Sequence, residues 1–94
     1  MSSGDGIEET FYSMQDFRNL LSQFNDSLRT SVMELENQHD HVSPLWQDQW
    51  RKDYDMIWLP FEETMRRYLN SGGPTYLEFL DLKSDAMRRY LFGD

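Results

Sequence analysis

Apolar side chains recur every three or four residues along most of the chain, and this spacing predicts an all-α protein. The first repeat, on a predicted helix at about 8–38, contains Met14, Phe17, Leu21, Phe24, Leu28, Ser31 and Leu35. The second, on a predicted helix at about 44–70, contains Trp46, Trp50, Tyr54, Ile57, Phe61, Met65 and Tyr68. A third helix at about 75–91 carries apolar residues on more than one stripe, which predicts burial on two sides.

Two breaks separate the predicted helices. Ser43 followed by Pro44 is typical of a helix start, with a side-chain cap and then a proline in the first turn. The segment 70–74, Asn-Ser-Gly-Gly-Pro, is typical of a helix end. We therefore expect a flexible tail over 1–7 and a single helical domain over 8–94. The domain is predicted to be a long helical hairpin with a third, C-terminal helix packed across it, and Pro60 should kink or split the second helix.

The composition disfavours several classes of function and adds little about the fold. The chain has 94 residues, no cysteine, and seventeen acidic against nine basic residues, for a net charge of -8. Such a charge disfavours nucleic-acid binding, and no segment predicts a membrane span. No catalytic motif, cofactor site or small-molecule site is recognisable. Glu36 and His39 have a spacing that a metal could use, but a solvated loop or a pH-sensitive hinge explains the same residues, and we predict neither a metal site nor an enzyme.

The two apolar stripes supply the candidate partner-binding residues. On the first predicted helix these are Phe17, Leu21, Phe24 and Leu28, and on the second they are Trp46, Trp50, Tyr54 and Trp58. Tryptophan and tyrosine are favoured at the centres of protein interfaces, although they serve equally well in a core. Because Trp50 lies midway between Trp46 and Tyr54 in the repeat, we expect it to be more deeply buried than Trp58.

Two amphipathic helices joined by a turn that carries tryptophan resemble the WXG family of small helical-hairpin proteins of type VII secretion. The family's Trp-x-Gly turn falls on Trp46-Gln47-Asp48, with aspartate in place of glycine, and the aromatic residues after it correspond to Tyr54 and Trp58. The family's Tyr-x-x-x-Asp/Glu export signal corresponds to Tyr90 and Asp94. The resemblance implies a dimeric helical bundle and secretion-linked pairing. A plain helix end, with Tyr90 half-buried, is the alternative for the last residues.

These observations predict a non-catalytic protein–protein interaction module. One form is a WXG-like secretion-linked substrate or partner that assembles a helical bundle with itself or with another chain. The alternative is a cytoplasmic acidic inhibitor, immunity protein or adaptor that binds a basic partner protein. The N-terminal segment does not predict a cleavable signal peptide, so both the cytoplasm and signal-independent secretion stay open.

Overall fold

A computed structural model describes residues 3–93, and all its regular elements are helical. Helix α1 (Ser3–Val42) is followed by a short 3-10 turn (Ser43–Leu45) and then by helix α2 (Arg51–Arg67). A π-helical turn (Tyr68–Gly72) joins α2 to helix α3 (Gly73–Phe92). The predicted all-α class is confirmed, and none of the described residues forms a strand.

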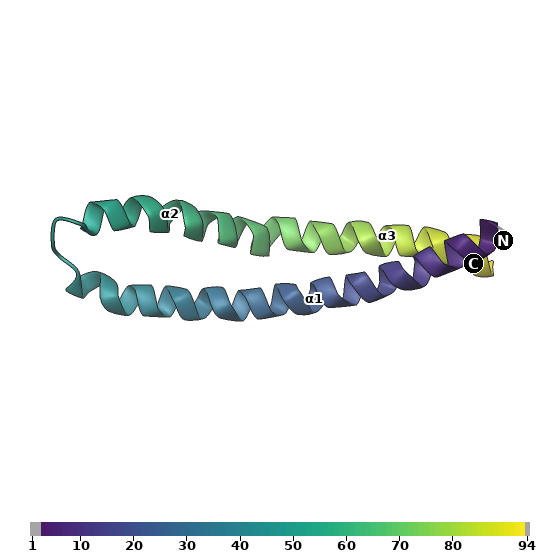
Figure 1. Cartoon of the computed structure of the whole chain (residues 1–94), viewed down its shortest axis with the longest axis horizontal. Coiled ribbons are helices and arrows are strands. Elements are labelled where there is room, and N and C mark those ends of the chain that lie inside the picture. Colours follow the sequence, from purple (N-terminus) through teal and green to yellow (C-terminus); the bar gives the residue numbers. More distant parts are fainter. Residues whose placement is uncertain (1–2, 94) are drawn as a thin grey trace.

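The molecule is a narrow hairpin of two arms. Helices α2 and α3 follow one another along a single line and form the second arm, which runs antiparallel to α1, so that both ends of the chain meet at one end of the rod (Figure 1). The rod measures 66 × 21 × 18 Å. The expectation of a third helix packed across the hairpin is not confirmed, because α3 extends the second arm instead of crossing it.

The π turn explains why the segment 70–74 does not end the helix. The N–H of Gly73 donates to the carbonyl of Tyr68, five residues back, which accommodates one additional residue in the turn. Pro74 has no N–H, so the carbonyl of Leu69 loses the donor that would continue this pattern. The guanidinium of Arg29 on α1 donates to that carbonyl at 3.2 Å. A side chain of the first arm thus completes the backbone hydrogen bonding of the second.

The same turn brings the two arms close together. Gly73 is buried, and a Cβ added there would lie 3.1 Å from Nδ2 of Asn25 on α1. The Tyr68 hydroxyl donates to Oδ1 of Asn25 at 2.6 Å. Glycine is therefore needed at position 73 for the close approach of the arms, and not as a helix terminator.

Several predicted boundaries were wrong. Helix α1 begins at Ser3, so residues 3–7 of the expected tail are helical, whereas Met1 and Ser2 lie outside the described residues. Ser43 and Pro44 form the 3-10 turn, and α2 begins only at Arg51. Pro60 lies inside α2 and does not split it. It sits on the exposed side of the arm, where water can satisfy the carbonyl that its missing N–H leaves free.

The interface between the arms uses a different register from the predicted stripe. On α1 it combines Met14, Leu21 and Leu28 with a second row at Phe11, Arg18, Asn25, Val32 and His39. Phe17 and Phe24 belong to neither row and are exposed. The second row was missed because three of its members are polar. Each has a partner on the second arm: Arg18 pairs with Asp81, Asn25 bonds Tyr68 and His39 bonds Tyr54.

The second arm is offset from its predicted stripe in the same way. Ile57 is exposed, and its neighbour Trp58 faces α1. The buried apolar side chains of the described chain are few, namely Phe11, Val32, Leu69 and Leu80. A hairpin of two helices therefore encloses only a thin line of apolar contacts.

We expect Arg29→Met to destabilise the hairpin by about 1–3 kcal/mol, because it leaves the Leu69 carbonyl without a donor. Pro74→Ala supplies a backbone N–H near that carbonyl. The double variant should therefore lose less stability than the sum of the two single variants, as measured by urea denaturation. Strict additivity of the two changes would contradict this role of Arg29.

Candidate protein-binding surface

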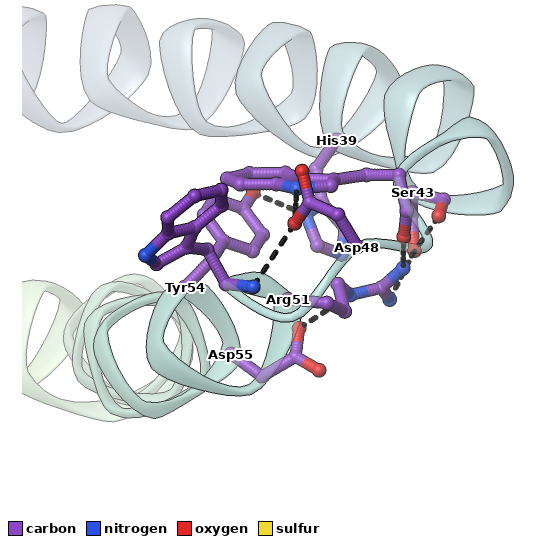
Figure 2. Close-up of polar contacts among 8 residues, drawn as sticks. His39, Ser43, Asp48, Arg51, Tyr54 and Asp55 are labelled. Atoms are coloured by element: carbon purple, nitrogen blue, oxygen red, sulfur yellow. Dashed lines mark hydrogen bonds and ion pairs between the residues drawn. The ribbon is translucent and has the colours of Figure 1, made fainter.

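The loop that joins the arms is held by Asp48. Its Oδ1 accepts a hydrogen bond from the indole Nε1 of Trp46 at 2.7 Å and another from the backbone N–H of Trp50 at 3.0 Å (Figure 2). The second contact is a local aspartate turn of the kind that favours helix starts. Asp48 therefore fixes both the orientation of Trp46 and the point where α2 begins.

Arg51, the first residue of α2, connects the loop and the end of α1 through hydrogen bonds. Its guanidinium donates to the carbonyl oxygens of Ser43 and Trp46, at 2.5 and 3.0 Å, and to the Ser43 hydroxyl (Figure 2). It also pairs with Asp55 one turn along α2, at 3.0 Å. One cation thus binds two carbonyls at the turn, of which that of Ser43 also accepts a hydrogen bond from the N–H of Trp46 at 3.3 Å.

Four ring side chains pack together beside this loop, and we call them the loop cluster: His39, Trp46, Tyr54 and Trp58. The rings of His39 and Trp58 are stacked with centroids 4.4 Å apart, and those of Trp46 and Tyr54 are 4.7 Å apart. A hydrogen bond of 2.5 Å joins Nδ1 of His39 to the Tyr54 hydroxyl. The hollow beside the cluster has a volume of about 220 Å³, which is below the range usual for ligand sites. We therefore assign the loop cluster a structural role, the packing of the loop end of the hairpin.

Three of the four candidate residues on the second predicted helix therefore lie together, but Trp50 does not join them. Its side chain is 58% exposed. The expectation that Trp50 is more buried than Trp58 was wrong, because the helical repeat does not continue back through the loop to Trp46. Helix α2 starts at Arg51, and the rings of Tyr54 and Trp58, four residues apart, both stack on His39.

Trp58→Ala should cost more stability than Trp50→Ala. Removing the half-buried Trp58 ring should cost about 2–3 kcal/mol, somewhat less than the cost for a fully buried tryptophan. Loss of the exposed Trp50 ring should change the free energy of unfolding by about 0.5 kcal/mol. Chemical denaturation of both variants checks this order, and a larger loss for Trp50→Ala would mean that the loop is placed differently.

One side of the hairpin is polar where the two arms meet. Glu36 of α1 forms a two-pronged ion pair with Arg66 of α2, and Arg18 pairs with Asp81 of α3 at 2.8 Å. A polar hollow of about 450 Å³ lies between α1 and α3, bordered by the Arg18–Asp81 pair, by Arg88 and by Ser84. We call this the polar side.

Near the loop, two carboxylates of the polar side, those of Glu36 and Glu62, lie close to the guanidinium of Arg66. The hydrogen bond from Arg66 holds the pKa of Glu36 below its ordinary value, and the proximity of Glu36 raises the pKa of Glu62. The same ion pair raises the pKa of Arg66. Glu36 therefore contributes stability above its normal pKa, and that contribution is lost as the pH falls through its lowered pKa in the folded protein.

Arg66→Gln should consequently destabilise the hairpin more at about pH 7 than at about pH 3, where protonation relieves the repulsion between Glu36 and Glu62. Thermal melting at the two pH values measures this difference. Arg67→Gln is the matched control, since Arg67 pairs with Glu63 on the solvent-exposed side of the same turn. An equal pH dependence of the two variants would contradict this role of Arg66.

The opposite side of the hairpin is apolar. Phe17 of α1 lies beside Tyr76 of α3, with ring centroids 6.0 Å apart, and Phe24 lies beside Tyr68 at 6.4 Å. Leu20 falls between the two phenylalanines at a spacing of three and four residues and is exposed with them. The exposed large apolar residues in the matching rows of the second arm are Ile57, Phe61, Tyr76, Phe79 and Tyr90. We call this surface the apolar side.

Charge is nearly absent from the rows that form the apolar side. On α1 the rows contain residues 10, 13, 17, 20, 24, 27, 31, 34 and 38, and only Glu34 among them is charged. On the second arm they contain residues 57, 61, 64, 68, 72, 76, 79, 83, 86 and 90, and only Lys83 is charged. The chain has seventeen acidic and nine basic residues in all, so its charges are concentrated elsewhere.

The predicted candidates on α1 are thus divided. Leu21 and Leu28 are half-buried between the arms, whereas Phe17 and Phe24 lie on the apolar side. Leu20, Tyr76 and Phe79 were not among the candidate partner-binding residues predicted from the sequence. These three residues can be recognised from the absence of charged residues at helical spacing. That absence becomes visible only when the rows of the two arms are placed side by side.

Of the two residues of the predicted export tag, the structure describes only Tyr90. Tyr90 is 70% exposed, so the half-burial expected for it in a plain helix end was wrong, and Asp94 lies outside the described residues. Gly93 ends α3 in a left-handed conformation, and its N–H donates to the Arg89 carbonyl at 3.0 Å.

The described residues form neither a cluster of metal ligands nor a membrane-spanning helix. Within residues 3–93 no three His, Asp or Glu side chains are grouped so that they could share a metal. No described helix is long and apolar enough to cross a membrane. The sequence significantly matches no protein-family model, no curated protein and no solved structure.

Proposed function

We propose that this chain is a non-catalytic protein–protein interaction module that completes a helical bundle through its apolar side. The observation that carries the proposal is the long, almost uncharged surface formed by both arms. Large contiguous apolar patches are uncommon on monomeric soluble proteins and mark interaction sites. Phenylalanine, tyrosine, leucine and isoleucine on two neighbouring helices form the surface that another pair of helices packs against.

A secretion-linked role of the WXG type is the finer form of this proposal. The hairpin shape, the Trp46-Gln47-Asp48 loop and the exposed Tyr90 support it. If Tyr90 belongs to an export signal, Tyr90→Ala should remove the protein from the culture medium of its source cell and leave its melting temperature nearly unchanged. Export that continues without the Tyr90 ring would argue against this form.

An acidic inhibitor or adaptor is the alternative, and the charge distribution favours it in one respect. At least five basic side chains are paired with acids of the same chain, and this leaves an acidic excess on the surface. A partner bound by that excess would dissociate as the salt concentration rises. A partner bound on the apolar side would not.

The test compares two leucines of nearly equal exposure, Leu20 on the apolar side at 65% and Leu82 outside it at 62%. Tagged wild-type protein, Leu20→Asp and Leu82→Asp are expressed in the source cell, and the cross-linked complexes are compared. We expect Leu20→Asp to lose its complexes and Leu82→Asp to keep them. Complexes that survive Leu20→Asp would contradict binding through the apolar side.

A further inference from the structure

We infer that the polar hollow between α1 and α3 binds a small zwitterion, a compound with one carboxylate and one ammonium group such as a free α-amino acid. The inference goes beyond the proposed function, because the hollow lies on the polar side and uses no residue of the apolar side. Three observations support it: a serine in an otherwise apolar row of α3, the unsatisfied hydroxyl of that serine, and an ion pair that retains hydrogen-bonding capacity.

The hollow exists because α3 presents a serine to α1 in a row that is otherwise apolar. At spacings of three and four residues, this row contains Leu77, Leu80, Ser84, Met87 and Leu91. Ser84 is 6% exposed, so it occupies a core position of the hairpin. A larger apolar side chain there would enlarge the thin core. Serine instead leaves a hollow of about 450 Å³, a volume within the range of small-molecule sites.

The hydroxyl of Ser84 has no hydrogen-bond partner among residues 3–93. Helical hydroxyls elsewhere in the chain do have one, since Thr10 and Thr30 donate to the carbonyl four residues back, at 2.9 and 3.3 Å. A buried hydroxyl without a partner costs stability, and alanine at this position would avoid that cost. Ser84 borders the hollow, so a molecule that enters the hollow is the partner within its reach.

The charges around the hollow favour one class of ligand. The lining carries two cations and two anions, namely Arg18, Arg88, Asp81 and Asp85. It is therefore neutral, although the chain as a whole has a net charge of -8. An anion alone would meet the two carboxylates, and a cation alone would meet the two guanidinium groups. A zwitterion adds no net charge and offers each kind of lining charge a group of the opposite sign.

The two ion pairs of the lining differ in the capacity that they leave for a ligand. Arg18 and Asp81 form a two-pronged pair, in which both carboxylate oxygens accept, at 2.8 and 3.3 Å. Within the described chain, Arg88 donates from Nη1 alone, to one oxygen of Asp85 at 2.9 Å. The other nitrogens of this guanidinium and the second oxygen of the carboxylate can therefore bind a ligand. Both side chains are about half exposed, so a ligand can reach them.

Arg88 is also held in place by the hairpin itself. Its guanidinium lies over the ring of Phe11 on α1, with Cζ 5.6 Å from the ring centroid. Phe11 is buried and packs edge-on against Phe92, with ring centroids 5.8 Å apart. A guanidinium held by a ring and a carboxylate loses little freedom when it binds a ligand. We therefore assign the ligand carboxylate to Arg88, the ligand ammonium to Asp85, and one further hydrogen bond to the hydroxyl of Ser84.

The first test follows the amide signals of the purified full chain by NMR while the common α-amino acids are added one at a time. Each is added to about 10 mM, which detects binding with a millimolar Kd. We expect at least one amino acid to shift the signals of residues 15–19 and 81–88 and to leave those of the loop cluster unchanged. If none shifts the signals at the hollow, the hollow holds only water and the inference is overturned.

Blocking one charge at a time tests the class of ligand. The methyl ester of the amino acid that binds retains only the ammonium, and its N-acetyl derivative retains only the carboxylate. Each should bind at least about 10-fold more weakly, because each loses the hydrogen bonds that one charged group makes. An N-acetyl derivative that binds as tightly as the amino acid would overturn the zwitterion as the ligand.

Variants test the assigned residues. Arg88→Gln should weaken binding at least about 10-fold, because it removes hydrogen bonds to a charged group. Arg89→Gln is the matched control and should bind as the wild type does, since Arg89 is the next residue of α3, is also exposed and lies outside the lining of the hollow.

Ser84→Ala separates a ligand-binding serine from a structural one. It should weaken binding by about 2- to 10-fold, the range that follows from one hydrogen bond. It should also raise the melting temperature of the chain without added amino acid, because it removes an unsatisfied hydroxyl. A lower melting temperature with unchanged binding would mean that the hydroxyl serves the fold, and it would overturn the inference.

Discussion

Each helical arm of this protein has only one neighbour, and this constraint shapes the whole molecule. A helix that packs against a single partner can bury only the side chains that face that partner. In this hairpin these are the row of Met14, Leu21 and Leu28 and the row of Phe11, Asn25 and Val32, with their counterparts on the second arm. The other apolar residues of each arm, including Phe17, Leu20 and Phe24, are left exposed. Part of this surplus forms the apolar side, where Glu34 and Lys83 are the only charged residues of the rows.

The π turn keeps this interface continuous along the rod. Without it, the run 70–74 would end the second arm halfway, because Pro74 cannot donate and two glycines precede it. The Arg29 guanidinium satisfies the freed carbonyl of Leu69, and Gly73 lets Asn25 and Tyr68 of the two arms meet. α3 therefore extends the line of α2, and the second arm contributes exposed apolar residues to the apolar side from Ile57 to Tyr90.

The sequence predicts the helical class and the hairpin, because apolar spacing of three and four residues is a property of each helix alone. It does not predict the register between the arms. The interface row on α1 includes Arg18, Asn25 and His39, and these polar residues are stabilised by partners more than a dozen positions away in sequence. A stripe chosen for hydrophobicity alone selects Phe17 and Phe24 in their place.

The same reasoning explains the errors at the two breaks. Ser43-Pro44 and Gly72-Gly73-Pro74 have the local chemistry of helix boundaries, and only contacts between the arms decide which of them ends a helix. At the first break, Asp48 and Arg51 build a loop, and α2 starts several residues later than predicted. At the second break, Arg29 allows the helix to continue. Of the candidate site, Phe17 and Phe24 were identified from the sequence, whereas their neighbours on the second arm required the alignment of the two arms.

The central claim is that the apolar side of the hairpin binds a partner protein. Comparison of the cross-linked complexes formed by the Leu20→Asp and Leu82→Asp variants tests this most directly, because the two leucines are exposed to nearly the same extent, 65% and 62%, and only Leu20 lies on the apolar side. The account predicts that Leu20→Asp loses its complexes and Leu82→Asp keeps them. Complexes that survive Leu20→Asp would contradict it.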